Sequence, residues 1–475
     1  MGLAVVLVAV GAGVDLACSP SAKQLPPDDF TLPAFDGSTF TLTEESGTQP
    51  ARVLVLGASG PESGKTVVFE DSTGAVIDTA TTDALGRAAR QIAPGTQVTV
   101  LFGDATAPAA VTYVAAQPGD LLVALDPSVA YGPSADEQIA TLPALPSQIQ
   151  EAGSVMAYSA LAGSCATYYE ELPFDLYLTP LQCSNALGQF PLLVLAEGQN
   201  GDVAYLFQRG NDVVTDGGVG GLAVNGTWST TFGTWNLQAT NAPASAPYAT
   251  GYFSEVTGGV MTWSSSNLDL SAGDGGVAPV TFTTHPGFAD FVQSEIGVFD
   301  NTGGAYTAIA TRAPAPAQSG SATLDFAGLL PLVTDATADY QTDPAHPTVK
   351  WTYATGTGGS AGTLVTLQWS EWDFDAGIST QKQWMFVVPP GATSLKAPSL
   401  PSANTAWTVV NFNGSNTPVI VSTDTTTGFG ADDFRQLAAS LPFPNWNYFY
   451  NSPFIPPLPA DGATLRLTTY GPPPG

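Results

Sequence analysis

The chain has 475 residues, and its 41 Asp or Glu against 12 Lys or Arg give a formal net charge of −29 at pH 7. A surface this acidic repels phosphate backbones and anionic headgroups, so we expect no nucleic-acid partner. Hydrophobic residues make up 44% of the chain, which is enough for packed cores and excludes global disorder. The acidity favours solubility outside the cell, with calcium binding by scattered carboxylates as the alternative.

The first chemical feature is a short apolar segment, residues 3–14, that leads into Leu16-Ala17-Cys18. It is shorter than the roughly 20 residues of a membrane-spanning helix and fits the core of a signal peptide. Leu-Ala-Cys after such a segment resembles the lipobox of bacterial lipoproteins. The resemblance implies a signal peptide over residues 1–18 and a lipid on Cys18. The mature protein is then extracytoplasmic, anchored at the outer membrane or cell surface.

One alternative stays open for this segment. The lipobox family has an apolar residue where this chain has Asp15, and no basic residue precedes Lys23. An ordinary secretory signal followed by an incidental cysteine would also fit, and the protein would then be secreted.

After a linker over 19–50, residues 51–127 form the clearest unit. Strand-like segments alternate with turns at Asp71-Ser72-Thr73-Gly74, Thr82-Asp83-Ala84-Leu85-Gly86 and Pro94-Gly95. This pattern resembles the carboxypeptidase-regulatory-like domain, a transthyretin- and immunoglobulin-related β-sandwich. The resemblance implies a structural or adhesive role and brings no catalytic residues. Gly74 and Gly86 are expected at positive φ, and Val98 and Val100 in the core.

A linker is expected over 128–152, followed by a β-sandwich over 153–270. This unit holds Cys165 and Cys183, the cysteines that remain if Cys18 carries lipid. In an oxidising compartment we expect them to form a disulfide, and closing such a loop is worth about 3 kcal/mol. Two buried free thiols are the alternative.

The rest of the chain is divided by Ala272–Gly276 into a β-rich domain over 277–401 and a C-terminal β segment over 402–475 that could pack on it. Residues 432–437 are the best candidate for a short helix. The aromatic run 442–450 either staples the C-terminus to the preceding domain or forms an exposed binding patch.

Strand patterns dominate the whole chain and predict an all-β fold of several tandem β-sandwich domains. The expected strands include Arg52–Leu56, Thr66–Phe69, Gln97–Phe102, Pro191–Ala196, Val203–Phe207, Tyr306–Thr311, Val349–Tyr353, Thr363–Trp369 and Trp384–Val388.

Two segments resemble the sequence motifs of catalytic loops. Residues 60–66 end in Gly64-Lys65-Thr66 like a P-loop, but Ser59 stands where the motif needs glycine, and a strand follows instead of a helix. Residues 358–362 match a nucleophile elbow around Ser360, but a strand-like segment follows and no histidine comes later in the chain. Both are interpreted as hairpin loops.

His285 and His346 are the two histidines of the chain, and each precedes a proline. General-base catalysis and metal binding usually rely on histidine, so we expect no catalytic residues, no metal and no cofactor. We therefore do not expect an enzyme.

A ligand platform is the strongest candidate for a site. Aromatic side chains and carboxylates together can bind sugars by stacking and hydrogen bonding. The residues are Trp369, Glu371, Trp372, Asp373 and Trp384. Tryptophans are also common between the sheets of a sandwich, so a core role is the alternative.

The sequence therefore predicts a non-enzymatic surface lipoprotein with a structural, adhesive or binding role. Its expected partners are the membrane, through the lipid anchor, and cell-surface proteins or polysaccharide. The alternative is a carbohydrate-binding or carbohydrate-degrading surface protein that uses Trp and carboxylate residues.

Overall fold

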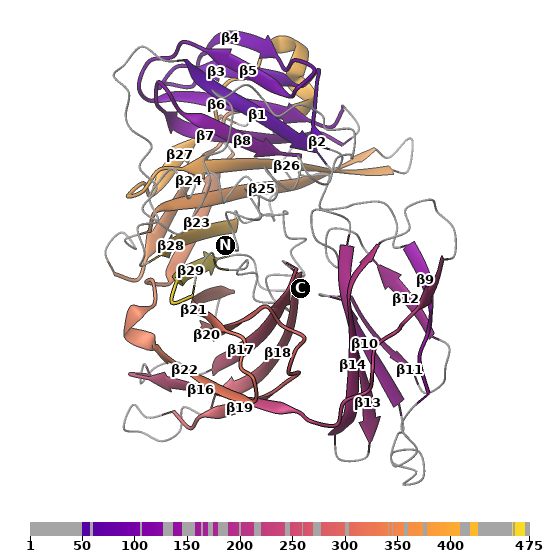
Figure 1. Cartoon of the computed structure of the whole chain (residues 1–475). Helices are drawn as coiled ribbons and strands as arrows, with labels where there is room; N and C mark the ends of the chain where they lie inside the picture. The colour runs from indigo at the N-terminus through magenta and orange to yellow at the C-terminus, as the bar shows by residue number, and fades with distance from the viewer. Residues whose placement is uncertain are drawn as a thin grey trace.

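Figure 1 shows the computed structural model of the protein, which describes residues 50–470 with internal gaps. The gaps are 58–59, 105–106, 127–135, 145–156, 163–164, 170–173, 179–188, 199–200, 213–219, 243–247, 259, 269–276, 300–303, 341, 344, 356–359, 374–377, 409–418, 426–457 and 459–460. Strands dominate the described part, which also contains the short 3-10 helices η3 (Phe326–Gly328) and η4 (Ser402–Trp407). The predicted all-β fold is confirmed, and each strand range named above lies within an observed strand.

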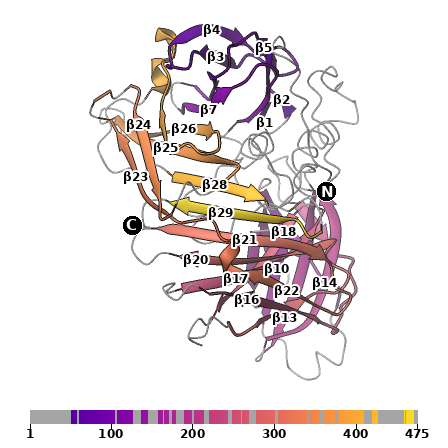
Figure 2. The ribbon, with the colours of Figure 1, turned by 90° about the vertical axis from the view of Figure 1, so that its left-hand side faces the viewer.

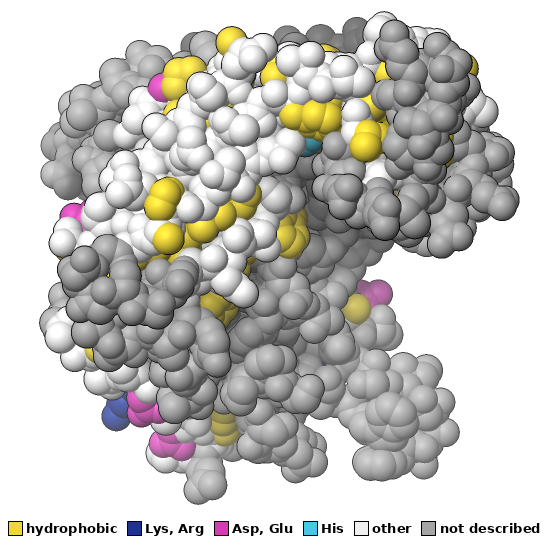
Figure 3. Space-filling model, turned by 90° about the horizontal axis from the view of Figure 1, so that it is seen from below, with side chains coloured by type: hydrophobic (Ala, Val, Ile, Leu, Met, Phe, Trp, Pro, Cys, Tyr) yellow, Lys and Arg dark blue, Asp and Glu magenta, His cyan; other side chains and the backbone are white. Residues whose placement is uncertain are grey.

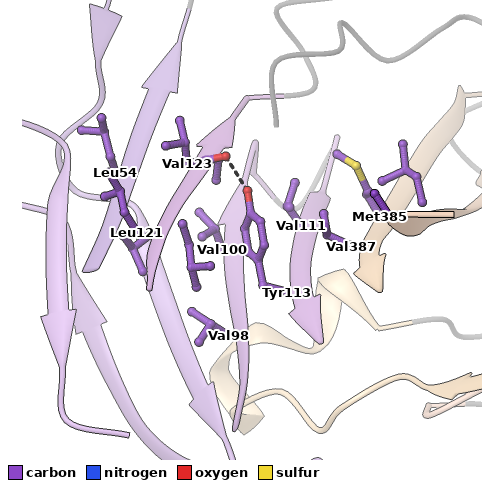
Figure 4. Close-up of a cluster of buried hydrophobic side chains, with 14 of the residues drawn as sticks. Leu54, Val98, Val100, Val111, Tyr113, Leu121, Val123, Met385 and Val387 are labelled. Atoms are coloured by element: carbon purple, nitrogen blue, oxygen red, sulfur yellow. Dashed lines mark hydrogen bonds between the residues drawn. The ribbon is translucent and has the colours of Figure 1, made fainter. Parts of the chain in front are cut away.

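The N-terminal sandwich consists of two facing sheets. One contains β1 (Ala51–Gly57), β2 (Gly60–Pro61), β5 (Arg87–Arg90) and β8 (Leu121–Leu125). The other face is formed by β3 (Thr66–Glu70), β4 (Val76–Thr81), β6 (Thr96–Phe102) and β7 (Ala109–Ala116). Val98 and Val100 are fully buried between the sheets, as predicted (Figure 4). The Tyr113 hydroxyl crosses this core to the Val123 carbonyl, so its polar end is satisfied.

The turns of this sandwich have the predicted backbone geometry. Gly74 has φ +87° and Gly86 has φ +70°, the left-handed region that glycine adopts without a steric penalty. At both corners an aspartate side chain, Asp71 or Asp83, accepts backbone N–H groups from the residues that follow it.

Gly86→Ala is expected to cost more stability than Gly64→Ala. Both glycines have positive φ, which costs an alanine about 1–2 kcal/mol. A Cβ on Gly86 would also lie 2.5 Å from the Val55 carbonyl oxygen, whereas a Cβ on Gly64 would meet nothing within 4 Å. Overpacking adds about 1–3 kcal/mol for Gly86→Ala. Chemical denaturation of both variants measures the difference, and equal losses would contradict the close approach at Gly86.

A twelve-stranded sheet runs through the molecule in the order β18-β17-β20-β21-β29-β28-β25-β26-β7-β6-β3-β4. Figure 2 shows its central strands stacked in this order from one end of the molecule to the other. The strands not yet bounded are β17 (Tyr248–Thr257), β18 (Val260–Leu268), β20 (Phe291–Phe299), β21 (Ala305–Pro314), β25 (Gly362–Asp373), β26 (Ile378–Val388), β28 (Val419–Thr425) and β29 (Thr464–Tyr470).

The N-terminal sandwich is joined to the rest of the chain by backbone pairing. β26 pairs in parallel with β7 over five residue pairs, from Gln383↔Ala109 to Val387↔Tyr113. Met385 and Val387 enter the same buried cluster as Val98 and Val100. The expected unit 51–127 is therefore a sandwich whose β7 edge is covered by a distant strand.

A third layer covers the opposite face of this region. The sheet β23 (Val333–Asp339), β24 (Thr348–Tyr353) and β27 (Ser394–Lys396) packs over β25 and β26. Its Val349 and Trp351 share a buried cluster with Trp384 and Phe386 and with Leu101 of β6. All seven residues of β6 are consequently buried, because β6 has a core on each side.

The expected boundary at residues 272–276 does not separate two units. β16 (Gly233–Thr240) pairs with β19 (Val280–Thr284) and β22 (Ser319–Asp325), and this sheet packs on β17, β20 and β21. The resulting third sandwich draws strands from both sides of 272–276, because antiparallel partners on each side complete one core. β18, before the expected boundary, and β19, after it, therefore both belong to the third sandwich.

The second sandwich combines two smaller sheets. One contains β10 (Ala157–Ala162), β11 (Cys165–Tyr169), β13 (Gln189–Gly198) and β14 (Gly201–Asp212). The other contains β9 (Asp136–Thr141), β12 (Phe174–Leu178) and β15 (Gly220–Ala223). β9 comes from the expected linker 128–152, so the second sandwich begins earlier than expected. It ends at β15, before the strands of the third sandwich.

Several expectations fall outside the described residues: the signal segment with Cys18, the helix at 432–437 and the aromatic run 442–450. Within the described ranges, no helix is long and apolar enough to cross a membrane.

Candidate functional site

The β25–β26 hairpin holds the tryptophans singled out from the sequence. Trp369 is 4% exposed and Trp384 is fully buried, so both belong to the core between the third layer and the twelve-stranded sheet. The core role is therefore the observed one for these two residues, because the sheet β23-β24-β27 covers the face on which they lie.

The other platform residues, Glu371, Trp372 and Asp373, continue β25 opposite Thr380, Ser379 and Ile378 of β26. The strand thus extends through Asp373, as the alternating pattern required. Their side chains lie outside the described part, so a platform formed by these three residues stays a prediction.

A buried row of hydrogen bonds explains why a tryptophan stands at position 384. Trp384 Nε1 donates to Thr112 Oγ1 at 2.8 Å, and the Thr112 hydroxyl lies 2.8 Å from the Thr99 hydroxyl. The indole also stacks on Phe386 with ring centroids 5.2 Å apart. This row crosses β26, β7 and β6, so it joins the N-terminal sandwich to the distant hairpin.

The segment that resembles a P-loop is not the predicted hairpin loop, because it leads from β2, which pairs with β1, to β3 in the facing sheet. Lys65 is followed directly by the strand β3, and its ammonium lies 2.9 Å from Glu62 Oε2 and 3.5 Å from Asp126 Oδ2. Burial lowers the pKa of Lys65, but the two carboxylates outweigh it and the pKa is raised overall. Lys65 thus bridges Glu62, which follows β2, and Asp126, which follows β8.

Ser360 likewise precedes a strand, but β24 and β25 belong to different sheets, so this is not the predicted hairpin loop either. It is buried, and β25 begins two residues later at Gly362. A strand at this place does not provide the helix that a nucleophile elbow requires.

Each histidine pairs with a carboxylate. His285 Nδ1 lies 2.6 Å from Glu255 Oε2, and the His285 backbone N–H donates to Glu255 Oε1 at 2.9 Å. Both side chains are at least nine-tenths buried. His346 Nδ1 lies 2.9 Å from Asp343 near the surface. The sequence did not predict the His285–Glu255 pair, because Glu255 lies on β17 and His285 follows β19, 30 residues further along the chain.

The turn at 285–290 joins the second and third sandwiches. Pro286 and Gly287, with φ +88°, form a turn closed by the Phe288 N–H on the His285 carbonyl. The side chains that meet this turn come from β14. Tyr205 Oη donates to the Pro286 carbonyl at 3.1 Å, and the Tyr205 ring lies 5.0 Å from the His285 ring.

Arg209 completes this inter-sandwich contact. It donates to the Gly287 carbonyl at 2.9 Å and forms an ion pair with Asp290 at 2.8 Å. Tyr205 and Arg209 point to the same side of β14 because side chains alternate along a strand. His-Pro-Gly-Phe was the available sequence signal, since Pro and Gly at these positions favour a tight turn.

A buried acid lies on the other face of the third sandwich's large sheet. Tyr306 Oη donates to Glu295 Oε1 at 2.5 Å, and the Tyr306 ring lies over Gly297, where a Cβ would come within 2.2 Å of the ring hydroxyl. Burial raises the pKa of Glu295 to about 8, against the opposing effect of the Tyr306 hydrogen bond. Burial, then the charge of Glu295, raises the pKa of Tyr252 to about 12.

Glu295 is therefore a carboxylic acid that stays largely protonated at neutral pH. Gly297 provides the space for Tyr306, and Tyr306 provides the hydrogen bond for Glu295. This arrangement serves the packing of the sheet, and sequence analysis missed it because the pairing of β20 with β21 had to be known first.

Cys165 is the first residue of β11, and Cys183 lies outside the described residues. Their pairing stays a prediction: non-reducing peptide mapping of protein made in an oxidising compartment should find a Cys165–Cys183 disulfide. Reduction should then cost about 3 kcal/mol of stability. Finding both cysteines as free thiols in that material would contradict the bond and weaken the extracytoplasmic assignment.

Comparison with known proteins identifies no family. No family model and no curated protein matches the chain. The carboxypeptidase-regulatory-like resemblance therefore remains an expectation about residues 51–127.

Several solved structures align with parts of the chain. The Bacillus anthracis TIE protein is 8% identical over 58% of this chain and half of that one, with a TM-score of 0.14. A streptococcal ancillary pilin is 9% identical over 58% of this chain and 99% of that one, with a TM-score of 0.14. The pilus adhesin SpaC from Lactobacillus rhamnosus GG is 8% identical over 74% and 44%, with a TM-score of 0.12. Such low TM-scores carry no argument about function.

Proposed function

We propose that the protein is a non-enzymatic structural or adhesive protein of the cell surface, anchored by a lipid on Cys18. The observation that supports this most directly is the continuous twelve-stranded sheet. It joins the N-terminal sandwich, the β25–β26 hairpin, the C-terminal strands and the third sandwich by backbone hydrogen bonds. A chain assembled in this way resists bending between its units, as a surface scaffold must.

The structural roles of the buried tryptophans and of the charged side chains described above support the same proposal. Trp384 and Trp369 fill a core, His285 bonds Glu255 inside the third sandwich, and Arg209 fixes the second sandwich to the third. Charged side chains are sparse on the described part of the end that Figure 3 shows, where hydrophobic side chains are scattered among uncharged ones. This surface suits contact with uncharged partners such as polysaccharide or other surface proteins.

A binding and turnover screen tests the non-enzymatic part of the proposal. The full chain is tested for binding to a panel of polysaccharides and for release of reducing sugar. We expect no release of sugar. Release that Glu371→Gln or Asp373→Asn abolishes would instead establish the carbohydrate-degrading alternative. Glu197→Gln is a suitable control, because Glu197 bonds only Ser159 within the described second sandwich and lies away from β25.

Cys18→Ala should move the protein from the membrane fraction to the soluble fraction, because the acyl anchor is lost. Globomycin should accumulate the unprocessed precursor of the parent chain. Fractionation followed by immunoblotting measures both effects. Membrane retention of the Cys18→Ala protein would place the anchor elsewhere in the chain. Cells that carry this variant should also lose any adhesion that depends on the protein.

A further inference from the structure

β4 forms one end of the twelve-stranded sheet, at the top of the molecule in Figures 1 and 2. Among the described strands, β3 is its one partner. The two exposed large hydrophobic side chains recorded for the described residues, Val76 at 39% and Ile77 at 59%, are adjacent on this strand. An edge strand with exposed β-formers is a template for strand addition.

The backbone geometry shows which groups of β4 are open. The Thr82 N–H donates to the Lys65 carbonyl, so residue 82 faces β3. Since successive residues alternate, Thr79 and Thr81 direct their N–H and C=O groups away from β3. Thr79 agrees with this placement, because its N–H is bonded at 2.8 Å by the carboxylate of its own neighbour Asp78.

We propose that β4 is a self-association surface, through which a second copy of the chain adds its own β4 antiparallel and extends the sheet across a two-fold axis. The register that centres on Thr79 places Ile77 opposite Thr81 and Asp78 opposite Ala80. Directly opposed residues then share a face, and no two carboxylates face each other. A register centred on Asp78 would oppose two carboxylates and is disfavoured.

The charge pattern of β4 favours a second copy as the occupant, because the register centred on Thr79 opposes no two carboxylates. The Asp78 carboxylate forms an ion pair with Arg90, so the edge is locally neutral although the chain carries −29. Repulsion between two whole chains opposes the dimer at low salt and is screened at high salt. The same Asp78 carboxylate caps the Thr79 N–H, so it restrains association until the second strand replaces that bond.

Sedimentation velocity on the full chain tests the proposal, in a Cys18→Ala background so that acyl chains cannot drive association. We expect a monomer–dimer equilibrium at concentrations on the order of 100 μM that strengthens as salt is raised. Ile77→Lys should weaken the dimer at least about tenfold, because it puts a charge on the edge. Asp78→Ala should strengthen it by a similar factor. Amide exchange at Thr79 and Thr81 should slow in the dimer.

Thr352→Lys is the matched control. Thr352 is exposed on β24, the central strand of its sheet, so the same change adds the same charge away from any edge. The Thr352→Lys chain should dimerise with the same dissociation constant as the parent chain. A monomer under all conditions, including Asp78→Ala at high salt, overturns the proposal. Equal effects of Ile77→Lys and Thr352→Lys overturn it as well, and so does a dimer in which Thr79 and Thr81 exchange unchanged. Circular dichroism of each variant establishes that the fold is retained.

Discussion

Trp384→Ala is expected to lower the free energy of unfolding by about 3–5 kcal/mol, as large-to-small changes of aromatic core residues do. The indole is fully buried, stacks on Phe386 and donates to Thr112, so its removal leaves a cavity between the third layer and the twelve-stranded sheet. Denaturant unfolding followed by circular dichroism measures the loss. Trp384→Phe should cost less, because it keeps a ring and loses mainly the hydrogen bond.

Ile77→Ala is the matched surface control for this prediction. Ile77 is 59% exposed, so its truncation should change stability by no more than about 0.5 kcal/mol. If Trp384→Ala unfolds like the parent chain, Trp384 does not belong to a packed core, and the ligand platform would have to be considered again.

Stability is expected to fall as pH rises from about 5 to about 8, in part because of Glu295. Its pKa in the folded chain is raised to about 8 from an ordinary value of 4.5, so between these values the folded chain holds a proton that the unfolded chain has released. The stabilisation is complete below the unfolded pKa and is lost as pH rises to the folded pKa. At about 1.36 kcal/mol for each pKa unit, the whole change amounts to roughly 5 kcal/mol.

Glu295→Gln should flatten this pH dependence, because glutamine keeps a neutral partner for Tyr306 without a titrating proton. Glu70 contributes in the same direction, since burial raises its pKa well above the usual value. Glu70→Gln should therefore remove a separate part of the slope. Parallel stability curves for the parent and Glu295→Gln between pH 5 and 8 would contradict the assignment. Both measurements use unfolding in denaturant at fixed ionic strength.

Local features of the fold could be predicted from the sequence because they depend on neighbouring residues. The turns at Gly74 and Gly86, the buried Val98 and Val100 and the strand nature of the segment after Lys65 follow from turn chemistry and alternation. Each of these is determined within a few residues, and the structure confirms each of them.

The long-range pairings could not be predicted in this way. Nothing in residues 109–113 indicates that residues 383–387 will pair with them, because strand partners are chosen by register and packing rather than by local pattern. The expected boundary at 272–276 was wrong for the same reason, since composition alone does not show that β17, before it, pairs with β20, after it.

Prediction of the candidate site from the sequence failed for the same reason, because the strand pairing was unknown. The strand carrying Trp369 was correctly placed, but which face would be covered depended on the sheet β23-β24-β27, which the sequence did not associate with it. The pairs Glu255–His285 and Glu295–Tyr306 each join residues that are separated in the sequence, so the contacts can be recognised only once the strand pairing is known.

The pairing of β7 with β26 has a consequence for how the chain is made. Thr112 and Trp384, which bond each other, are 272 residues apart. At synthesis rates of 5–20 residues per second, the strand that covers the edge of β7 is made roughly 15–55 s after β7 itself. The last strand, β29, then closes the gap between β21 and β28. Folding thus finishes only after the whole chain has been delivered, so a chaperone that shields the waiting β7 edge would raise the yield of native protein.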